Sequence, residues 1–304
     1  MADLAVLILT HNEELHIERA LRSVMGVARE VTVVDSGSTD RTVELAAALG
    51  ARVLTHPFEN YARQFQWGLD NAGFRSDWVL RLDADEVIEP DLAEEIERRL
   101  PDLPADVTGV NLKRKHIFMG RWIRHGGRYP LILLRLWRRG GAHIEDRWMD
   151  EHMVLDRGRS VTFEGGFADA NLKDLTYFID KHNRYATREA IDVLIAKYGL
   201  SAAPTAALAS PQAALKRGVK VGVFNRAPFP LGPCVYFLYR YLARLGVLDG
   251  MEGLIYHGLQ GGWYRFLVGA KVRELERLIA PVAGRQARLA ALARATGHAL
   301  SPEA

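Results

Sequence analysis

The stretch EVTVVDSGSTDRTVELAAALG, residues 30–50, indicates the class of fold. An apolar run opens the stretch and ends at Asp35, as expected for a buried strand. The run RTVELAAALG that follows predicts a helix stopping at Gly50. Thr39 or Asp40 can cap the start of this helix, and small residues ease the turn before it. A cap leaves Asp35 unexplained, because this carboxylate stands at the end of the strand.

The same alternation of strand and helix continues on both sides of this stretch. Alternating signals of this kind predict an α/β fold, in which helices flank a mainly parallel sheet with right-handed crossovers. Further strands are expected in the region after residue 107. The expected strands of the first hundred residues are 4–10, 30–35, 51–57 and 77–83, and the expected helices are 13–24, 41–50, 60–73 and 90–100.

Composition and charge narrow the class of protein. The 304 residues are 48% hydrophobic and 25% charged, which suits one large domain with an appendage or two modest domains. Cys234 is the single cysteine, so an internal disulfide is excluded and a reducing compartment fits. Asp3 stands where a signal peptide carries basic residues, so the first apolar run is interpreted as a strand.

The region around residue 200 contains the best candidate for a domain boundary. LSAAPTAALASPQ, residues 200–212, follows an expected long helix over 171–199 and is rich in Ala, Ser and Pro. We therefore expect a catalytic domain at 1–200 and a helical region at 201–304. The second region is rich in aromatics and Gly with sparse Arg, which predicts helices lying in a membrane interface. A helical appendage packed on the core is the alternative.

Polar side chains follow three of the expected strands at their carboxyl ends. Ligands of an open parallel sheet bind at this edge. Carboxylates gathered there repel one another unless a positive group lies among them. The side chains in question are Thr10, Asn12 and Glu13 after the first strand, Asp35 after the second, and Asp83 and Asp85 after the fourth.

Asp83 and Asp85 suggest a metal site. Their side chains point the same way if the backbone stays extended. With no histidine or cysteine nearby, they form a hard oxygen site suited to Mg²⁺ or Mn²⁺. Such sites are completed by substrate phosphates, which predicts a phosphate-bearing substrate. Neither G-x-x-x-x-G-K-[ST] nor G-x-G-x-x-G after the first strand is present.

Three motifs together give the chain a family resemblance. LILTHNEE (7–14), VVDSGSTDRT (33–42) and VLRLDADE (79–86) resemble family 2 glycosyltransferases of the GT-A fold, over roughly the first 200 residues. RWMDEHMVL (147–155) and the segment 171–190 are similar to a subgroup that builds lipopolysaccharide core or exopolysaccharide. LYRYLARLGVLDG, residues 238–250, is similar to the same subgroup.

The resemblance implies roles for individual residues. Arg63 and Gln64, in NYARQFQWGL, would face the nucleotide or the diphosphate, with plain helix surface as the alternative. The other implied roles are a nucleotide pocket lined by Thr10, Asn12 and Glu13, a base or ribose contact from Asp35, and a metal pair of Asp83 and Asp85, with Asp83 also beside the nucleotide.

The chemistry implied is an inverting sugar transfer. A divalent ion on Asp85 would neutralise the departing nucleotide diphosphate. A general base would activate the acceptor hydroxyl on the opposite face of the sugar. The family carries an acidic motif in the later half of the domain, and MDEHM matches it imperfectly. Glu151 is favoured as the base and Asp150 is the alternative; a polar loop without catalytic role is the third interpretation.

A basic stretch, residues 113–139, admits several partners. It can hold a diphosphate or anionic acceptor, face acidic lipid headgroups, or form a solvated surface. Nucleic acid ranks last, because the acidic strand edge would repel a polyphosphate that no metal bridges.

The sequence thus predicts a glycosyltransferase bound peripherally to the cytoplasmic face of the inner membrane. It would use a nucleotide-sugar donor, a UDP-sugar, and a saccharide or lipid-linked glycan acceptor. One rival is a polyprenyl-phosphate glycosyltransferase, and another is a non-catalytic nucleotide-sugar-binding scaffold. A nucleotidyltransferase is disfavoured, because THNEELHIERA (10–20) lacks the glycine-rich loop that it needs.

Overall fold

The protein divides into two compact units, Met1–Lys173 and Asp174–Ala304. The computed structural model describes residues 2–145, 152–200, 229, 231–298 and 300.

One half of the sheet in the first unit is parallel, in the order β3-β2-β1-β4. Its register aligns Thr10 with Asp35 and Leu9 with Asp83, so the three strands end at one edge. These elements are β1 (Leu4–Thr10), α1 (Ile17–Val24), β2 (Glu30–Asp35), α2 (Thr42–Ala48), β3 (Arg52–Thr55), α3 (Tyr61–Asn71) and β4 (Trp78–Asp83).

The other half of the sheet is mixed and continues from β4 in the order β8-β6-β11-β5. β8 is antiparallel to both of its neighbours, whereas β6 and β11 are parallel. The predicted α/β class, a mixed sheet flanked by helices, is confirmed. The remaining elements are β5 (Glu86–Ile88), α4 (Pro90–Arg99), β6 (Val107–Phe118), β7 (Arg121–Trp122), β8 (Leu131–Arg138), the ribbon β9 (Ala142–Ile144) with β10 (Met153–Leu155), and β11 (Arg159–Asp169).

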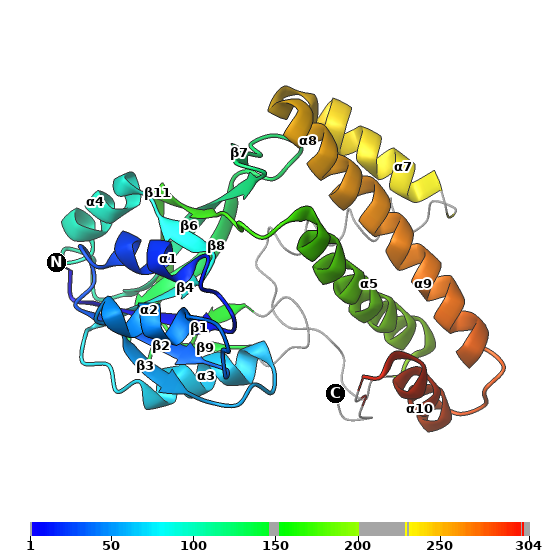
Figure 1. Cartoon of the computed structure of the whole chain (residues 1–304), viewed down its shortest axis with the longest axis horizontal. Coiled ribbons are helices and arrows are strands. Elements are labelled where there is room, and N and C mark those ends of the chain that lie inside the picture. Colours follow the sequence, from blue (N-terminus) through cyan, green and yellow to red (C-terminus); the bar gives the residue numbers. More distant parts are fainter. Residues whose placement is uncertain (1, 146–151, 201–228, 230, 299, 301–304) are drawn as a thin grey trace. The chain divides into compact units, whose positions relative to one another are not determined.

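Helices cover both faces of the sheet (Figure 1). Leu4, Val6 and Ile8 pack in one core with α1, α2 and α4. Ala5 and Leu7, which alternate with them along β1, pack in the other core with α3 and the β9–β10 ribbon. A strand buried on both faces needs a continuous apolar run, which is what LAVLILT supplies.

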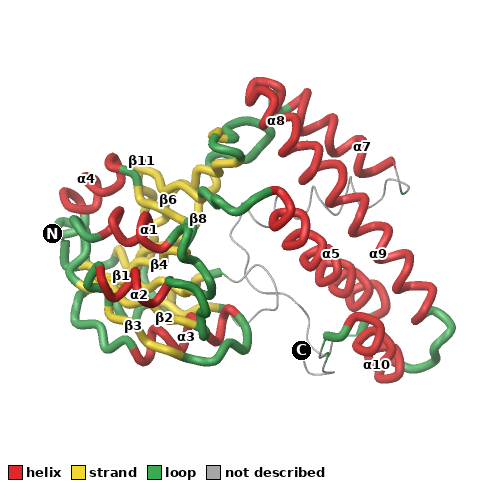
Figure 2. Tube along the Cα trace, in the orientation of Figure 1, coloured by secondary structure: helices red, strands yellow, loops and turns green. Residues whose placement is uncertain are grey.

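Among the described residues, the second unit contains only helices and loops (Figure 2). α5, predicted as a long helix, packs in this unit along α9 through Ala186, Tyr264 and Val268. The boundary expected after residue 200 borders the segment 201–228, outside the described residues, and stays a prediction. The elements are α5 (Leu175–Tyr198), α7 (Leu231–Leu238), the π-turn η2 (Tyr239–Ala243), the 3₁₀ turn η3 (Gly246–Asp249), α8 (Gly250–His257), the π-turn η4 (Gly258–Trp263), α9 (Tyr264–Ile279) and α10 (Arg285–Thr296).

None of the helices that the structure describes combines the length and the apolar character needed to cross a membrane.

Candidate functional site

Asp35 holds the turn between β2 and α2. The carboxylate is 2% exposed, and one oxygen accepts hydrogen bonds from Thr10 Oγ1 at 2.9 Å and from the Ser38 hydroxyl. The other oxygen accepts from the backbone N–H groups of Gly37 and Ser38, at 2.9 and 2.8 Å. Four donors match the acceptor capacity of a carboxylate. A ligand could therefore bond to Asp35 only by replacing one of them.

Asn12 joins the β1–α1 turn to the β2–α2 turn. Its side-chain oxygen accepts from the N–H of Thr39 at 2.8 Å, and its own N–H donates to Ser38 Oγ at 2.9 Å. Its backbone is left-handed, with φ of 56°, a conformation that Asn adopts more readily than most residues. Asp40, which precedes the N-cap residue Arg41, accepts from the N–H of Thr42 at 3.0 Å and from the N–H of Glu14 at 3.1 Å. The two turns are thus locked side by side.

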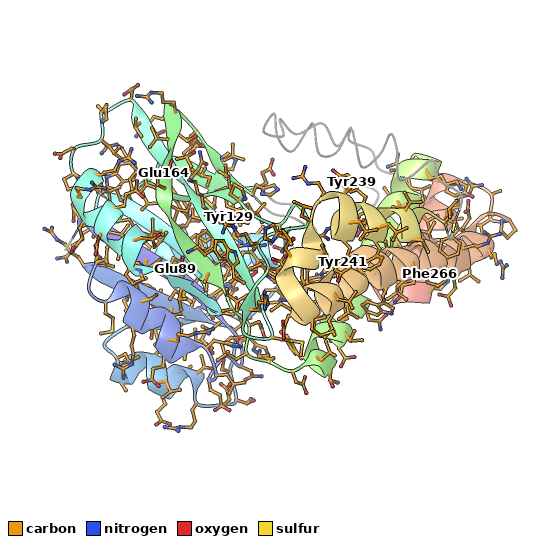
Figure 3. The ribbon with its side chains drawn as sticks, turned by 90° about the horizontal axis from the view of Figure 1, so that it is seen from above. Glu89, Tyr129, Glu164, Tyr239, Tyr241 and Phe266 are labelled. Carbon is orange, nitrogen blue, oxygen red and sulfur yellow. The ribbon has the colours of Figure 1, made fainter. Side chains whose placement is uncertain are left out.

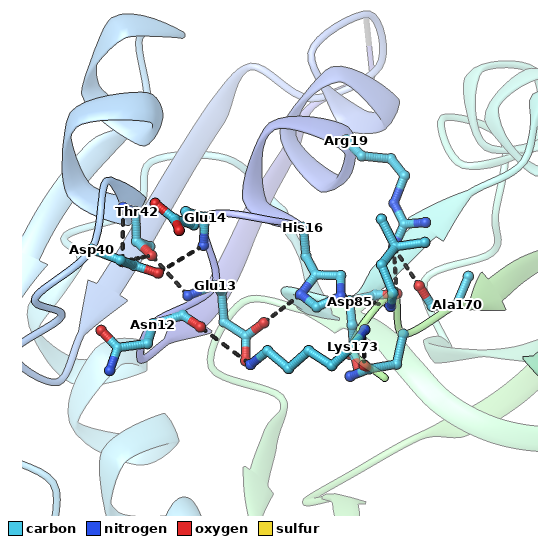
Figure 4. A network of polar contacts seen from close by, with 12 residues as sticks. Asn12, Glu13, Glu14, His16, Arg19, Asp40, Thr42, Asp85, Ala170 and Lys173 are labelled. Atoms are coloured by element: carbon cyan, nitrogen blue, oxygen red, sulfur yellow. Dashed lines mark hydrogen bonds and ion pairs between the residues drawn. The ribbon is translucent and has the colours of Figure 1, made fainter. Parts of the chain in front are cut away.

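Glu13 is tied to the chain on two sides (Figure 4). One oxygen lies 2.5 Å from Nδ1 of buried His16, and the other lies 2.9 Å from Lys173 Nζ. His16 Nε2 accepts from the N–H of Leu172 at 2.8 Å, so the ring proton lies on Nδ1 and points to Glu13. Burial raises the pKa of Glu13, but the hydrogen bonds from His16 and Lys173 outweigh it and lower that pKa. Glu13 is therefore ionised, and its contacts with His16 and Lys173 stabilise this turn.

Residues 170–173, directly after β11, form what we call the strap. Asn171 Nδ2 donates to Asp85 Oδ2 at 2.9 Å, and the N–H of Ala170 donates to the Asp85 carbonyl at 3.0 Å. Arg19 donates to the Ala170 carbonyl, and Lys173 Nζ donates to the Asn12 carbonyl at 3.2 Å (Figure 4). The strap thus connects the first motif of the sequence to the third.

Asp83 lies in a network of buried charges. Tyr61 donates to one of its oxygens at 2.5 Å, and Arg135 Nη2 lies 3.3 Å from the other. Arg81 Nε lies 3.6 Å from the oxygen that Tyr61 contacts. Burial opposes ionisation, yet the charges of Arg135 and Arg81 outweigh it and hold the pKa of Asp83 well below its usual range.

Glu86 belongs to the same network of buried charges. It is 1% exposed, accepts from Arg135 Nη2 at 2.7 Å and accepts from the N–H of Asp83 at 2.9 Å. Burial, together with the charge of Asp83, raises the pKa of Glu86 to about 8 against the pull of Arg135. The sequence placed Glu86 among the carboxylates that follow β4 and Arg135 in the basic stretch, without assigning either a role, and it did not single out Tyr61 or Arg81. A signal existed, because WVLRLD and LILLRLW each place one arginine inside an otherwise apolar strand.

The structure gathers the residues predicted after β1 and β2 into one cluster. Thr10 and Asn12 contact the β2–α2 turn directly, and Glu13 donates its N–H to Thr42 Oγ1 at 2.8 Å. Asp83 and Asp85 lie at the end of the neighbouring strand β4. The strap links this end of β4 to the cluster.

Gln64 and Arg63 differ in position. Gln64 is 1% exposed and donates to Ser36 Oγ and to the carbonyl of His56, each at 3.0 Å. Through its hydrogen bond to Ser36, Gln64 therefore stabilises the loop after Asp35. Arg63 is exposed on α3 and pairs with Glu59 at 2.7 Å, as expected for a helix surface.

Asp150 and Glu151, the two candidates for the base, lie outside the described residues. On either side of the undescribed segment, β9 pairs antiparallel with β10 and the N–H of Glu145 donates to the His152 carbonyl at 3.0 Å.

The two carboxylates of the D-x-D motif differ as candidates for a metal ion. In the part of the chain that the structure describes, no three or more His, Cys, Asp or Glu side chains gather as metal ligands. Asp83 faces two guanidinium groups, whose charge disfavours a cation beside it. Asp85 accepts from the uncharged amide of Asn171 and supplies the oxygen ligand that Mg²⁺ and Mn²⁺ prefer. One guanidinium, that of Arg19, donates to the Asp85 carbonyl at 3.4 Å, whereas two guanidinium groups face the Asp83 carboxylate, so a divalent ion is less opposed at Asp85.

Sequence comparisons place these motifs among known proteins. Residues 5–159 match the family model of Glycosyl transferase family 2. A glycosyltransferase of Rickettsia bellii is 44% identical over 94 residues, 31% of this chain and 31% of that protein. The match thus spans about a third of the length of this relative and of its counterpart in Rickettsia typhi. The lipopolysaccharide core biosynthesis glycosyltransferase LpsC of Rhizobium meliloti is 27% identical over 291 residues, 90% of this chain and 93% of that protein.

Among solved structures, one match is glucosyl-3-phosphoglycerate synthase of Mycobacterium tuberculosis in complex with Mn²⁺, UDP and glucosyl-3-phosphoglycerate. It is 26% identical, covers 37% of this chain and 43% of that chain, and has a TM-score of 0.31.

Proposed function

Because the chain belongs to glycosyl transferase family 2, we propose that it transfers a sugar from a nucleotide-sugar donor, a UDP-sugar, with inversion at the transferred carbon. The acceptor is a saccharide or lipid-linked glycan of lipopolysaccharide core or cell-surface polysaccharide synthesis. The observation that carries this proposal is the register of the sheet. It aligns Thr10 with Asp35 and ends β4 at Asp83, so the polar motifs share the edge at which such sheets bind ligands.

The donor site proposed here has a nucleoside end and a diphosphate end. The locked turns around Asn12 and Asp35 would hold the nucleoside, with one donor to Asp35 giving way to the ligand. Asp83, held by Arg81 and Arg135, would lie beside the nucleotide. Asp85 would hold Mn²⁺ or Mg²⁺, which when bound supplies a Lewis acid against the charge of the departing diphosphate.

The acceptor hydroxyl needs a base on the side of the sugar opposite the diphosphate. Glu151 is the proposed base and Asp150 is the alternative. A single carboxylate that activates the incoming oxygen leads to direct displacement with inversion. The similarity to LpsC along 90% of the chain supports an acceptor of the lipopolysaccharide core class. Such acceptors are lipid-linked, which suits a protein at the cytoplasmic face of a membrane.

Substitution of Asp85 tests the metal assignment. We expect Asp85→Asn to reduce Mn²⁺-dependent hydrolysis or transfer of the donor by about 10²-fold or more, with thermal stability near wild type. Asp102→Asn, at an exposed carboxylate away from the sheet edge, is the matched control and keeps full activity. Equal activity in Asp85→Asn and Asp102→Asn would contradict the assignment.

Two further measurements test the donor and the base. A thermal-shift screen of nucleotide diphosphates, with and without Mn²⁺, identifies the nucleotide; stabilisation by none of them counts against the proposed donor class.

Glu151→Gln is expected to bind the donor normally and to lose transfer. If Asp150→Asn loses transfer instead, the base is Asp150; if neither does, the base lies elsewhere.

A further inference from the structure

One end of the second unit exposes an unusual amount of apolar side chain. In the described residues, half of the large hydrophobic side chains that are exposed lie within residues 231–254. We call this set the apolar end. Met251 is 64% exposed, Leu248 58% and Leu242 56%. The set comprises Leu231, Val235, Leu238, Tyr239, Leu242, Leu245, Val247, Leu248, Met251 and Leu254.

The apolar side chains follow the surface of consecutive helical segments. Leu231, Val235 and Leu238 recur at helical spacing along α7, Leu242 follows on η2, and Leu245 comes directly before η3. Val247, Leu248, Met251 and Leu254 then continue through η3 into α8. Tyr239 lies within this set, and Phe266, which is 45% exposed, lies on α9 (Figure 3). An exposed apolar surface of this extent marks a site of contact with another apolar phase or molecule.

The interior of the same segment is polar, which reverses the usual order of a protein in water. Arg240, Asp249 and His257 are 7%, 3% and 0% exposed. The Arg240 guanidinium lies over the rings of Tyr236 and Tyr256, 5.7 and 5.8 Å from their centroids. Arg240 and Asp249 are therefore withdrawn from the surface, while Leu and Met side chains are presented on it.

The segment is also closely packed, so the apolar end has a defined shape. A Cβ on Gly246 would lie 2.6 Å from the His257 ring, and a Cβ on Gly253 would lie 2.5 Å from Asp249 Cβ. The absence of side chains at these two glycines allows η3 and α8 to approach each other. The outward apolar side chains are thus held by a packed support.

Charge identifies the partner. Within residues 231–254, all of which are described, Arg244 is the one exposed charged side chain, and Glu252 is half-buried. A cation next to an apolar surface is complementary to an anionic lipid headgroup above acyl chains.

We infer that the apolar end inserts into the headgroup region of one leaflet of an anionic bilayer, with Arg244 at the level of the headgroups. This inference deepens the membrane part of the proposed function, on which it rests, and names the surface responsible. The occupant is lipid, and a second copy of the chain is the competing occupant.

Co-sedimentation of the full-length protein with vesicles tests the inference. The vesicles contain phosphatidylcholine alone or with phosphatidylglycerol. We expect the double variant Leu248→Ser, Met251→Ser to lower partitioning onto the mixed vesicles by at least about tenfold. Arg244→Gln is expected to lower it about fivefold, and only where phosphatidylglycerol is present. Leu278→Ser, at a side chain that is 52% exposed near the end of α9, is the matched control and keeps wild-type binding.

Three results would overturn the inference. One is that the wild-type protein binds neither kind of vesicle, and another is that the double variant binds as well as Leu278→Ser. The third is that light scattering finds a wild-type dimer that the double variant converts to a monomer, which assigns the surface to a second copy. Donor hydrolysis in vesicle-free buffer, measured on the same proteins, reports on the proposed enzyme activity separately, so failure of one proposal is distinguishable from failure of the other.

Discussion

Asn171, in the strap, contacts the side chain of Asp85, the proposed metal ligand. Its amide donates to Asp85 at 2.9 Å, and its side-chain oxygen accepts from the N–H of Lys173 at 2.9 Å. It is therefore a positioning residue, which fixes the carboxylate proposed to hold the ion. Substituting groups that orient metal ligands typically weakens metal affinity by about 10- to 100-fold.

We accordingly expect Asn171→Ala to weaken Mn²⁺ binding about tenfold. Isothermal titration of Mn²⁺ in the presence of UDP measures this affinity without relying on turnover. Leu172→Ala, the next residue along and 58% exposed, is the control, because its side chain can be shortened without altering the hydrogen bond of its backbone. An unchanged Mn²⁺ affinity in Asn171→Ala would show that the strap does not position Asp85.

Asp169 provides a prediction about stability and pH. The carboxylate lies 3.2 Å from His116 Nδ1 and 3.6 Å from Arg114 Nη1. Burial opposes its ionisation, but the hydrogen bond with His116 and the charges of His116, Arg114 and Arg128 outweigh burial and hold the pKa of Asp169 well below 3.8. The charge of Asp169 in turn helps to raise the pKa of Glu86, on the neighbouring strand.

Because the folded-state pKa of Asp169 is depressed, its contribution is present above pH 3.8 and is lost as the pH falls through the folded value. We expect Asp169→Asn to lower the free energy of unfolding by about 3 kcal/mol at neutral pH, since Arg114 loses the charge of the carboxylate at 3.6 Å and retains Glu86 at 4.0 Å. The gap from wild type should close below pH 3.8. Urea unfolding across a pH series measures both curves; a gap that stays constant in acid would show that charge is not the cause.

The residues of the site were predictable to different degrees. Asp35 and Asp85 follow apolar runs, so their place at the sheet edge follows from the sequence. The four donors on Asp35 depend on the conformation of one turn, and the contacts of Asp85 come from a segment 86 residues further along. Arg135 reaches Glu86 across a sheet whose strand order no local pattern specifies. Partners so distant in sequence were not accessible to motif reasoning.

Strands and helices show the same division between local and distant information. Strands β1 to β4 and the helices between them have long apolar or amphipathic patterns and were predicted. β5, β9 and β10 have three residues each and exist through pairing with distant segments, so nothing local indicated them. The antiparallel course of β8 against β4 likewise depends on distant pairing, such as that of Trp78 with Arg138.

The contact of α4 with β11 yields a prediction about packing. A Cβ on Gly165 would lie 2.6 Å from Leu92 Cα and 2.7 Å from Leu92 N, and backbone atoms of a helix cannot move aside alone. The N–H of Gly165 also donates to buried Glu95 at 2.7 Å. We expect Gly165→Ala to lower the free energy of unfolding by about 3 kcal/mol.

Gly26→Ala is the control for this prediction, because a Cβ on Gly26 would have no atom within 4 Å among the described residues. Chemical denaturation of both variants against wild type measures the difference. Equal stability of the two variants would show that α4 and β11 do not approach each other as closely as described.

The two units of the chain have different proposed roles. The polar sheet edge lies in the first unit, and the apolar end lies in the second. If both proposals hold, chemistry on the donor depends on the first unit alone, whereas delivery of a lipid-linked acceptor also depends on the second. Substitutions in the apolar end should therefore separate two activities of the same protein.

We expect the double variant Leu248→Ser, Met251→Ser to hydrolyse the donor in vesicle-free buffer at the wild-type rate. Its transfer of sugar to a lipid-linked acceptor embedded in anionic vesicles should fall about tenfold, because fewer enzyme molecules reside at the surface where the acceptor is found. Raising the vesicle concentration should restore the rate, since the defect lies in partitioning and not in chemistry. Product formation over a vesicle titration measures this. A loss that saturating vesicles do not repair would mean that these side chains act on the acceptor itself, and an equal loss of donor hydrolysis would mean that they support the fold of the catalytic unit.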